Sequence, residues 1–254
     1  MQNVTIGVFF CYLIMTSLKR LKLLFFVPLL AVFFSCSARI DGIVREGGSA
    51  DLSFTTALKP RTIALIRSIR GFMGEAADAP ILDGAVIAAS LAEAPGVRAV
   101  SLTNTSPTAL NGSLSISNVA DFLVAGDAQG RFITFTEGPS PGSSSIIVNL
   151  DRNSAPALIA RLSPELEGYL SALMAPVVLG ETMTRQQYLG LVGMIYGRAL
   201  ADEIAAARIR ASIEFPRPLT QVRGGTASGN RAEFDIALVD LLVLEQPLRY
   251  EVSW

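Results

Sequence analysis

The sequence predicts an α+β protein in which a mainly antiparallel sheet, built from hairpins, packs against a helical block. Segments of alternating apolar and polar residues occur in pairs, and short runs rich in glycine, proline, asparagine or serine separate the members of each pair, as in hairpins. Other segments repeat their apolar residues at helical spacing. Strands and helices do not alternate one by one, which a doubly wound fold with a parallel sheet would require.

The first predicted elements are a hairpin and a helix. Residues 39–45 and 50–57 alternate, and Glu-Gly-Gly-Ser at residues 46–49 suits the tight turn between them. Pro60 fits the first turn of a helix, because its fixed φ suits that position and its missing N–H is not needed there. We therefore expect a helix over residues 61–73, where apolar residues recur every three or four positions.

A second helix and a second hairpin follow. The helix is predicted over residues 81–93, since Pro95-Gly96 is a typical end signal. Residues 97–103 alternate like a strand. Asn111-Gly112 is a strong signal for a two-residue turn, so the partner strand is expected after it, over residues 113–117.

The middle of the chain predicts a short helix and a third hairpin. Ser117 or Asn118 can cap a helix that runs to Val124. Residues 132–136 and 145–150 are expected to be strands on either side of a Gly-Pro-Ser-Pro-Gly-Ser loop.

A helical block comes next in the sequence. Ser154 and Ser163 each stand just before a proline, which is the pattern of an N-cap followed by a first turn. Thr184 and Gln187 have the spacing of a capping box. One long helix is therefore predicted from Thr184 to about Ala207.

The last part of the chain returns to strands. Residues 209–215 alternate strictly between apolar and polar side chains. Residues 219–226 and 231–237 are predicted to form a hairpin around the turn Ser228-Gly229-Asn230, and residues 248–254 a final strand.

The first 35 residues have the pattern of a secretory leader. After Met15 a basic stretch precedes an apolar run over residues 23–34, which leads to Ser35-Cys36. The run is shorter than the roughly 20 residues that a membrane-spanning helix needs, and a proline interrupts it. We therefore predict a signal peptide over residues 1–35, with the true start possible at Met15, and a single lipid-anchored domain over residues 36–254.

The residues Phe33-Phe34-Ser35-Cys36 resemble the lipobox of bacterial lipoproteins. The resemblance implies cleavage by signal peptidase II before Cys36, after diacylation of its thiol, and a place in the bacterial cell envelope on the inner or the outer membrane. The alternative is a leader that is retained or cut elsewhere, with an incidental cysteine. If Met15 is the initiator, Cys11 is never made, so an internal disulfide is excluded.

Composition excludes several kinds of chemistry. The 254 residues contain no histidine, so Ser-His-Asp or Cys-His catalysis and histidine-ligated zinc are ruled out. The formal net charge of −1 becomes more negative once a leader with basic residues and no acid is removed, which argues against nucleic acid as a partner. No phosphate-binding GxxxxGK loop or dinucleotide-binding GxGxxG motif occurs, and we expect no cofactor and no metal.

Candidate catalytic groups have simpler interpretations. The serines at residues 143–145 fit a polar hairpin loop, and Lys59 before Pro60 fits a solvated helix start. Pairs of carboxylates can hydrolyse glycosides when they converge in a cleft. The available pairs fit solvated helix faces equally well, and they are Glu165 with Glu167 and Asp202 with Glu203.

A stripe of small residues follows the long predicted helix. Gly190, Gly193, Gly197 and Ala201 fall on one face of it, although each glycine costs about 1 kcal/mol of helix propensity relative to alanine. The stripe indicates either close packing against a neighbouring element or, with Tyr196 as a wall, a groove for an apolar ligand.

Three arginines mark the helix predicted over residues 61–73. Arg61, Arg67 and Arg70 lie close to Phe72 and Met73, and a basic amphipathic helix can rest on anionic lipid headgroups. The simpler interpretation is a solvated face.

Both ends of the mature chain resemble the LppM-type bacterial envelope lipoproteins. The resemblance implies an α+β domain behind a lipidated cysteine, for which interaction with lipids or envelope glycolipids has been proposed, and it brings no catalytic residues. The segments that carry it are Cys36, Arg39-Ile40-Asp41-Gly42-Ile43-Val44, Gly47-Gly48-Ser49-Ala50-Asp51-Leu52, Phe215-Pro216, Gly224-Gly225, Ser228-Gly229-Asn230 and Phe234-Asp235-Ile236.

The leading hypothesis is a membrane-anchored envelope lipoprotein that is not an enzyme and binds an apolar or lipidic ligand or an envelope partner. The alternatives are a carboxylate-dependent envelope hydrolase and a structural or surface-antigen lipoprotein without a ligand. An apolar site would favour the first hypothesis, and two carboxylates that converge in a cleft would favour the hydrolase. A solid core with neither feature would favour the structural lipoprotein.

Overall fold

The protein has an α+β fold, as the sequence predicts. The computed structural model describes residues 37–72, 81–126, 132–140, 142–155, 174, 177 and 179–254. The leader, Cys36, Met73, Ser163, Glu165 and Glu167 lie outside the described residues.

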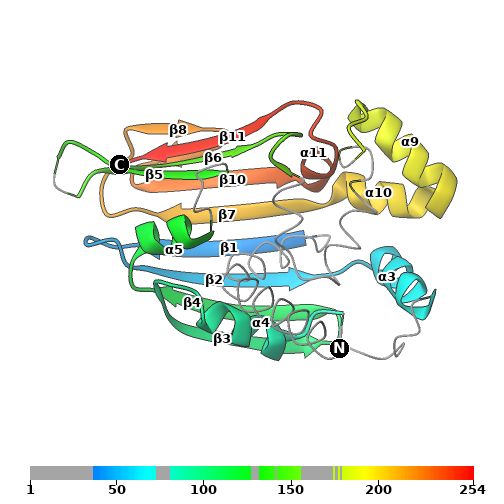
Figure 1. Cartoon of the computed structure of the whole chain (residues 1–254), viewed down its shortest axis with the longest axis horizontal. Helices are drawn as coiled ribbons and strands as arrows, with labels where there is room; N and C mark the ends of the chain where they lie inside the picture. The colour runs from blue at the N-terminus through cyan, green and yellow to red at the C-terminus, as the bar shows by residue number, and fades with distance from the viewer. Residues whose placement is uncertain are drawn as a thin grey trace, which may run out of the picture.

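A seven-stranded sheet forms the body of the fold, with strand order β3-β4-β2-β1-β7-β10-β9 (Figure 1). Its neighbours are antiparallel except β1 and β7, which run parallel from the pair Ser37 and Arg208 to the pair Ile43 and Glu214. The mainly antiparallel sheet is thus confirmed, with a parallel junction at its centre. The strands are β1 (Ser37–Val44), β2 (Ala50–Ala57), β3 (Val97–Ser106), β4 (Ala109–Ile116), β7 (Arg208–Glu214), β9 (Thr226–Ser228) and β10 (Arg231–Ala237).

A second sheet has four strands in the order β5-β6-β11-β8. They are β5 (Ile133–Glu137), β6 (Ser144–Leu150), β8 (Gln221–Arg223) and β11 (Leu248–Ser253). The single strand predicted over residues 219–226 is wrong, because β8 pairs in the second sheet and β9 in the first. The chain crosses between the sheets at Gly224, whose φ is +75°, and Gly225, where a Cβ would stand 2.5 Å from the carbonyl oxygen of Glu233.

The main core lies between these sheets and the helices beside them. Phe54 and Leu114 from the first sheet and Val252 from the second are buried in one apolar cluster. Trp254 closes it, with its ring 4.7 Å from the ring of Phe215. Helices α3 (Pro60–Phe72), α4 (Gly84–Ala92) and α5 (Val119–Gly126) complete this part of the molecule (Figure 1).

A second core forms at one end of the large sheet, where α9 (Arg185–Tyr196), α10 (Arg198–Ala206) and α11 (Leu238–Val243) meet. Helix α11 was not predicted. Its residues Leu238, Val239, Leu242 and Val243 are all buried, and because its only polar residue is Asp240, no amphipathic period marks it in the sequence.

The turn predicted at Asn111-Gly112 is wrong. Both residues lie inside β4, and the chain reverses between Ser106 and Ala109. Gly112 sits opposite Phe54 on one side and Leu102 on the other, and a Cβ there would stand 2.2 Å from Leu102 Cδ2 and 2.8 Å from Phe54 Cζ. The glycine therefore makes room for large neighbours in the core, a role that local sequence does not distinguish from a turn.

The cap signals at Thr184 and Asn118 are confirmed, whereas Asp151 takes the N-cap role predicted for Ser154, since its Oδ1 accepts the amides of Asn153 and Ser154. The long helix is not confirmed. Thr184 and Gln187 form the predicted capping box, and Asn118 Oδ1 accepts hydrogen bonds from the amides of Ala120 and Asp121. The helix predicted to about Ala207 is broken at Gly197 into α9 and α10, because the φ of +93° there is incompatible with helix.

Gly112→Ala is expected to lower the free energy of unfolding by about 1–3 kcal/mol, because the new methyl group overpacks the core between β2 and β3. Gly190→Ala is the matched control: a Cβ at this helical glycine meets nothing within 4 Å, so the variant should gain up to about 1 kcal/mol from helix propensity. Urea denaturation of both variants measures the difference, and equal stabilities would contradict the assignment.

Candidate functional site

The described chain begins at the helical end of the large sheet. Ser37, the residue bonded to Cys36, pairs with Arg208, which follows the end of α10 by two residues. Figure 1 shows α3, α9, α10 and α11 gathered at this end, while the chain terminus Trp254 lies at the other. The predicted lipidation position is thus adjacent in sequence to a residue of the helical end.

The glycine stripe does not form one face. Gly193 in α9 packs against α10, since a Cβ there would lie 3.7 Å from Ala201 Cβ. Gly190 faces open space and Gly197 is the elbow between the two helices. The close-packing interpretation therefore holds for Gly193 and Ala201 only: no atom lies within 4 Å of a Cβ at Gly190, and the positive φ at Gly197 ends α9 there.

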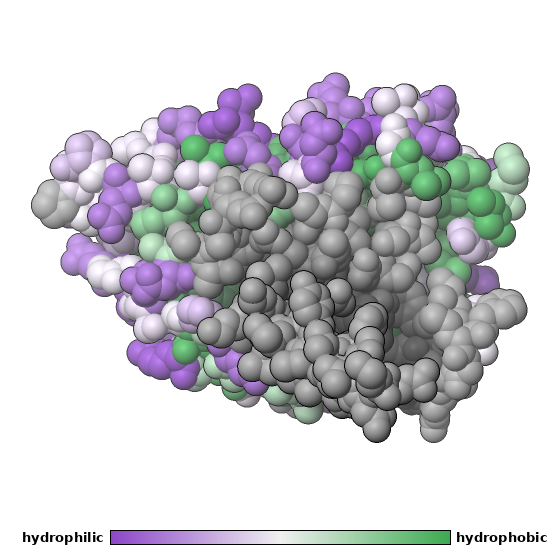
Figure 2. Space-filling view, viewed as in Figure 1, coloured by the Kyte–Doolittle hydropathy of each residue, from purple (hydrophilic) through white to green (hydrophobic). Residues whose placement is uncertain are grey.

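Exposed apolar side chains gather at the end of α9, a feature that the sequence interpretation missed. We call Leu191, Met194, Ile195 and Tyr196 the α9 tip; their exposed fractions are 38 %, 83 %, 59 % and 49 %. Figure 2 shows apolar surface collected over α9. The signal in the sequence is Leu-Val-Gly-Met-Ile-Tyr-Gly over residues 191–197, a helical run without a polar face.

The predicted arginine helix is α3, held against α10 by a carboxylate. Glu203 of α10 accepts hydrogen bonds from the amides of Arg61 and Thr62, all at 3.1 Å, and so caps the first turn of α3 from a distant part of the chain. The side chains of Arg61 and Arg67 are exposed on this helix. The side chain of Arg70 lies outside the described residues.

The carboxylates do not form an acid–base pair in the described part of the chain. Asp202 is exposed, and both oxygens of Glu203 are occupied by the cap. The solvated interpretation is thus wrong for Glu203, whose amide partners lie in a helix more than a hundred residues away in sequence. Among the described residues no group of histidine, cysteine or acidic side chains could hold a metal.

The serine loop is a hairpin connection. Ser143 Oγ donates a hydrogen bond to the carbonyl oxygen of Ser140 at 2.7 Å and accepts one from its amide at 3.2 Å. The polar-loop interpretation of the serines also takes a GxSxG nucleophile elbow to be absent, yet Gly138, Ser140 and Gly142 have its spacing. A nucleophile elbow joins a strand to a helix, whereas this loop joins two antiparallel strands.

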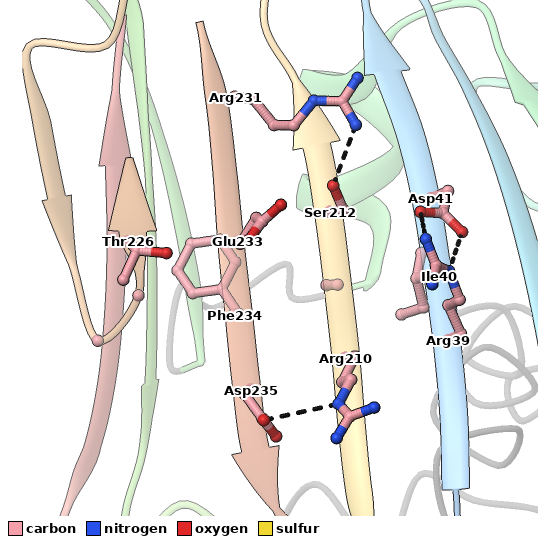
Figure 3. A pocket seen from close by; sticks show the side chains of 13 residues that line it. Arg39, Ile40, Asp41, Arg210, Ser212, Thr226, Arg231, Glu233, Phe234 and Asp235 are labelled. Atoms are coloured by element: carbon pink, nitrogen blue, oxygen red, sulfur yellow. Dashed lines mark hydrogen bonds and ion pairs between the residues drawn. The ribbon is translucent and has the colours of Figure 1, made fainter. Parts of the chain in front are cut away.

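The outer face of the large sheet carries a shallow hollow of about 660 Å³ with charged walls (Figure 3). Arg39 donates a 2.7 Å hydrogen bond to Asp41, and Arg210 approaches Asp235 at 3.6 Å. The hydrogen bond from Arg39 is the main reason that the pKa of Asp41 is below its usual value. These exposed pairs contribute little free energy, because water screens them.

Comparisons with known proteins give a remote likeness in structure. No family model and no curated protein matches the sequence. The fold is similar to the folded domain of LppM from Mycobacterium tuberculosis. The TM-score is 0.40 at 11 % sequence identity, over 85 % of this chain and 87 % of the other. In the described residues, no helix is both long enough and apolar enough to span a bilayer.

Glu203→Ala is expected to lower the free energy of unfolding by about 1–2 kcal/mol, because it leaves the first amides of α3 without their acceptor. Asp202→Ala, at the exposed neighbouring position, should change stability by less than about 0.5 kcal/mol. Thermal denaturation of the two variants checks the cap, and a cost for Asp202→Ala as large as for Glu203→Ala would rule it out.

Gly197→Ala is expected to cost about 1–3 kcal/mol of stability, because φ +93° with ψ 148° is a backbone conformation open essentially to glycine only. Gly193→Ala serves as control, since its new methyl group would make an ordinary contact with Ala201. Circular dichroism during urea denaturation measures both, and an unchanged midpoint for Gly197→Ala would show that the elbow is not held in this conformation.

Proposed function

We propose that the protein is a lipid-anchored lipoprotein of the bacterial envelope, held at a membrane by a diacylated Cys36. In this proposal it is not an enzyme, and it binds an apolar or lipidic ligand or an envelope partner at its helical end. The observation that carries the proposal is the succession of a basic stretch, an apolar run and Ser35-Cys36 directly before β1.

The position of β1 supports a short tether. Ser37 is already paired with β2 and β7, so at most the Cys36 residue itself separates the proposed acyl chains from the sheet. Each acyl chain contributes about 0.8 kcal/mol per buried methylene, and two chains anchor a protein stably where one does not. The fold would therefore stay within a few ångströms of the lipid headgroups.

The proposed absence of catalysis is supported by what the polar groups already do. Glu203 caps α3, and Ser143 and Ser140 bond each other within a turn. The charged pairs on the outer sheet face are matched and solvated. None of these groups is left poised beside a partner that would activate it.

An apolar binding role is supported by the α9 tip. Met194 and Ile195 are more than half exposed although they are among the most apolar residue types. Exposed apolar groups that cluster in this way mark contact sites for lipids or proteins. We therefore assign the proposed ligand or partner to the helical end rather than to the polar sheet face.

Cys36→Ala is expected to leave the leader uncleaved and the chain without acyl mass, because the proposed processing needs the modified thiol. The measurement is mass spectrometry of the full chain expressed in a bacterial host. Cys11→Ala is the matched control and should be processed normally. A mature N-terminus at position 36 in the Cys36→Ala variant would disprove lipidation at this residue.

A further inference from the structure

We infer that the α9 tip inserts into the interfacial layer of the same bilayer that holds the acyl chains of Cys36. The protein would then contact the membrane at two points. The inference rests on the proposed function, since it takes the bilayer to be the surface nearest to Ser37.

Helix α9 is apolar on two sides. Tyr188 and Val192 are buried against α10 and α11 in the second core. Leu191, Met194 and Ile195 follow the i, i+3, i+4 spacing of a separate face, and this face is exposed. A globular helix needs one apolar face for its core, so the second face indicates a surface that is covered by something else.

The position of Ser37 in the fold points to the bilayer as the surface that covers this face of α9. Ser37 pairs with Arg208, and the nine residues of α10 that lie between the elbow and β7 span about 14 Å. An acylated Cys36 and the α9 tip are therefore within one short helix of each other. A tethered tip meets the bilayer at a far higher effective concentration than any free partner.

The surroundings of the tip suit a lipid interface. Tyr196 is half exposed, and tyrosine is typical of the layer in which lipid headgroups meet acyl chains. Arg198 is exposed just past the elbow, and Arg61 and Arg67 are exposed on α3, which Glu203 fixes beside α10. Of the two acids on α10, Asp202 is exposed, and Glu203 is half-buried and caps α3. The arginines place positive charge at the level of anionic headgroups.

A depth measurement on the acylated protein tests the inference. The purified mature protein carries its native Cys36 modification, so Ala199→Cys adds one free thiol on exposed α10 beside the tip, and Thr136→Cys adds one on exposed β5 as a matched control. Each is labelled with an environment-sensitive fluorophore and reconstituted in vesicles of phosphatidylethanolamine and phosphatidylglycerol with brominated acyl chains.

Insertion predicts that the fluorophore at position 199 is quenched at least threefold more than the fluorophore at position 136. Adding Met194→Ser and Ile195→Ser to the Ala199→Cys protein should abolish most of that difference, which shows that the tip rather than the label enters the bilayer. Equal quenching at both positions in protein that floats with the vesicles overturns the inference, as does quenching that the two serines leave unchanged.

Flotation separates this inference from the proposed function. Protein that lacks acyl mass and does not float overturns the proposed function and, with it, the inference, which requires acyl chains on Cys36. Floating protein whose fluorophore at position 199 responds to protein density but not to brominated lipid shows that the tip binds a second copy, and that result also overturns insertion.

Discussion

The parallel pairing of β1 with β7 is the interaction on which the rest of the architecture depends. It joins an N-terminal set of strands, β2, β3 and β4, to the C-terminal strands β9 and β10. Each set is formed by antiparallel neighbours close in sequence, but only the β1–β7 ladder makes them one sheet. It also fixes Ser37 beside the end of α10, so the start of β1 and the helical elbow come to lie at the same end of the molecule.

Glu203 extends this junction from the sheet to the helices. Its carboxylate satisfies the first amides of α3, and a carboxylate at a helix N-terminus also interacts favourably with the helix dipole. Helix α3 follows β2, while α10 precedes β7, so the cap ties together the helices attached to the two strands on either side of β1. The arginines of α3 owe their position beside α10 to this acid.

Local signals in the sequence were sufficient where the structure is decided locally. The turn at residues 46–49, the capping box at Thr184 and the turn at residues 228–230 need only the residues that form them. The turn predicted in the same way at Asn111-Gly112 is wrong. A glycine is needed there because Phe54 and Leu102 in the neighbouring strands leave no room for a side chain. Those contacts are absent from the local sequence.

The candidate site was harder to predict for the same reason. The sequence identified Gly193 and Gly197 as unusual, but the packing of one and the positive φ of the other depend on how α10 folds back on α9. The exposure of Met194 and Ile195 depends on which face of α9 meets α11, and α11 itself has no amphipathic period to predict it. Glu203 resembled a solvated acid because its partners are far away along the chain.

The central place of β1 has a mechanical consequence. A pull on the residue before Ser37 acts lengthwise along a strand that is hydrogen-bonded on both sides, to β2 and to β7. Such a load shears the hydrogen bonds of both ladders at once. A load on the end of a hairpin would instead open the hydrogen bonds one at a time. A fold pulled through this strand would resist tension far better than one pulled through an edge strand.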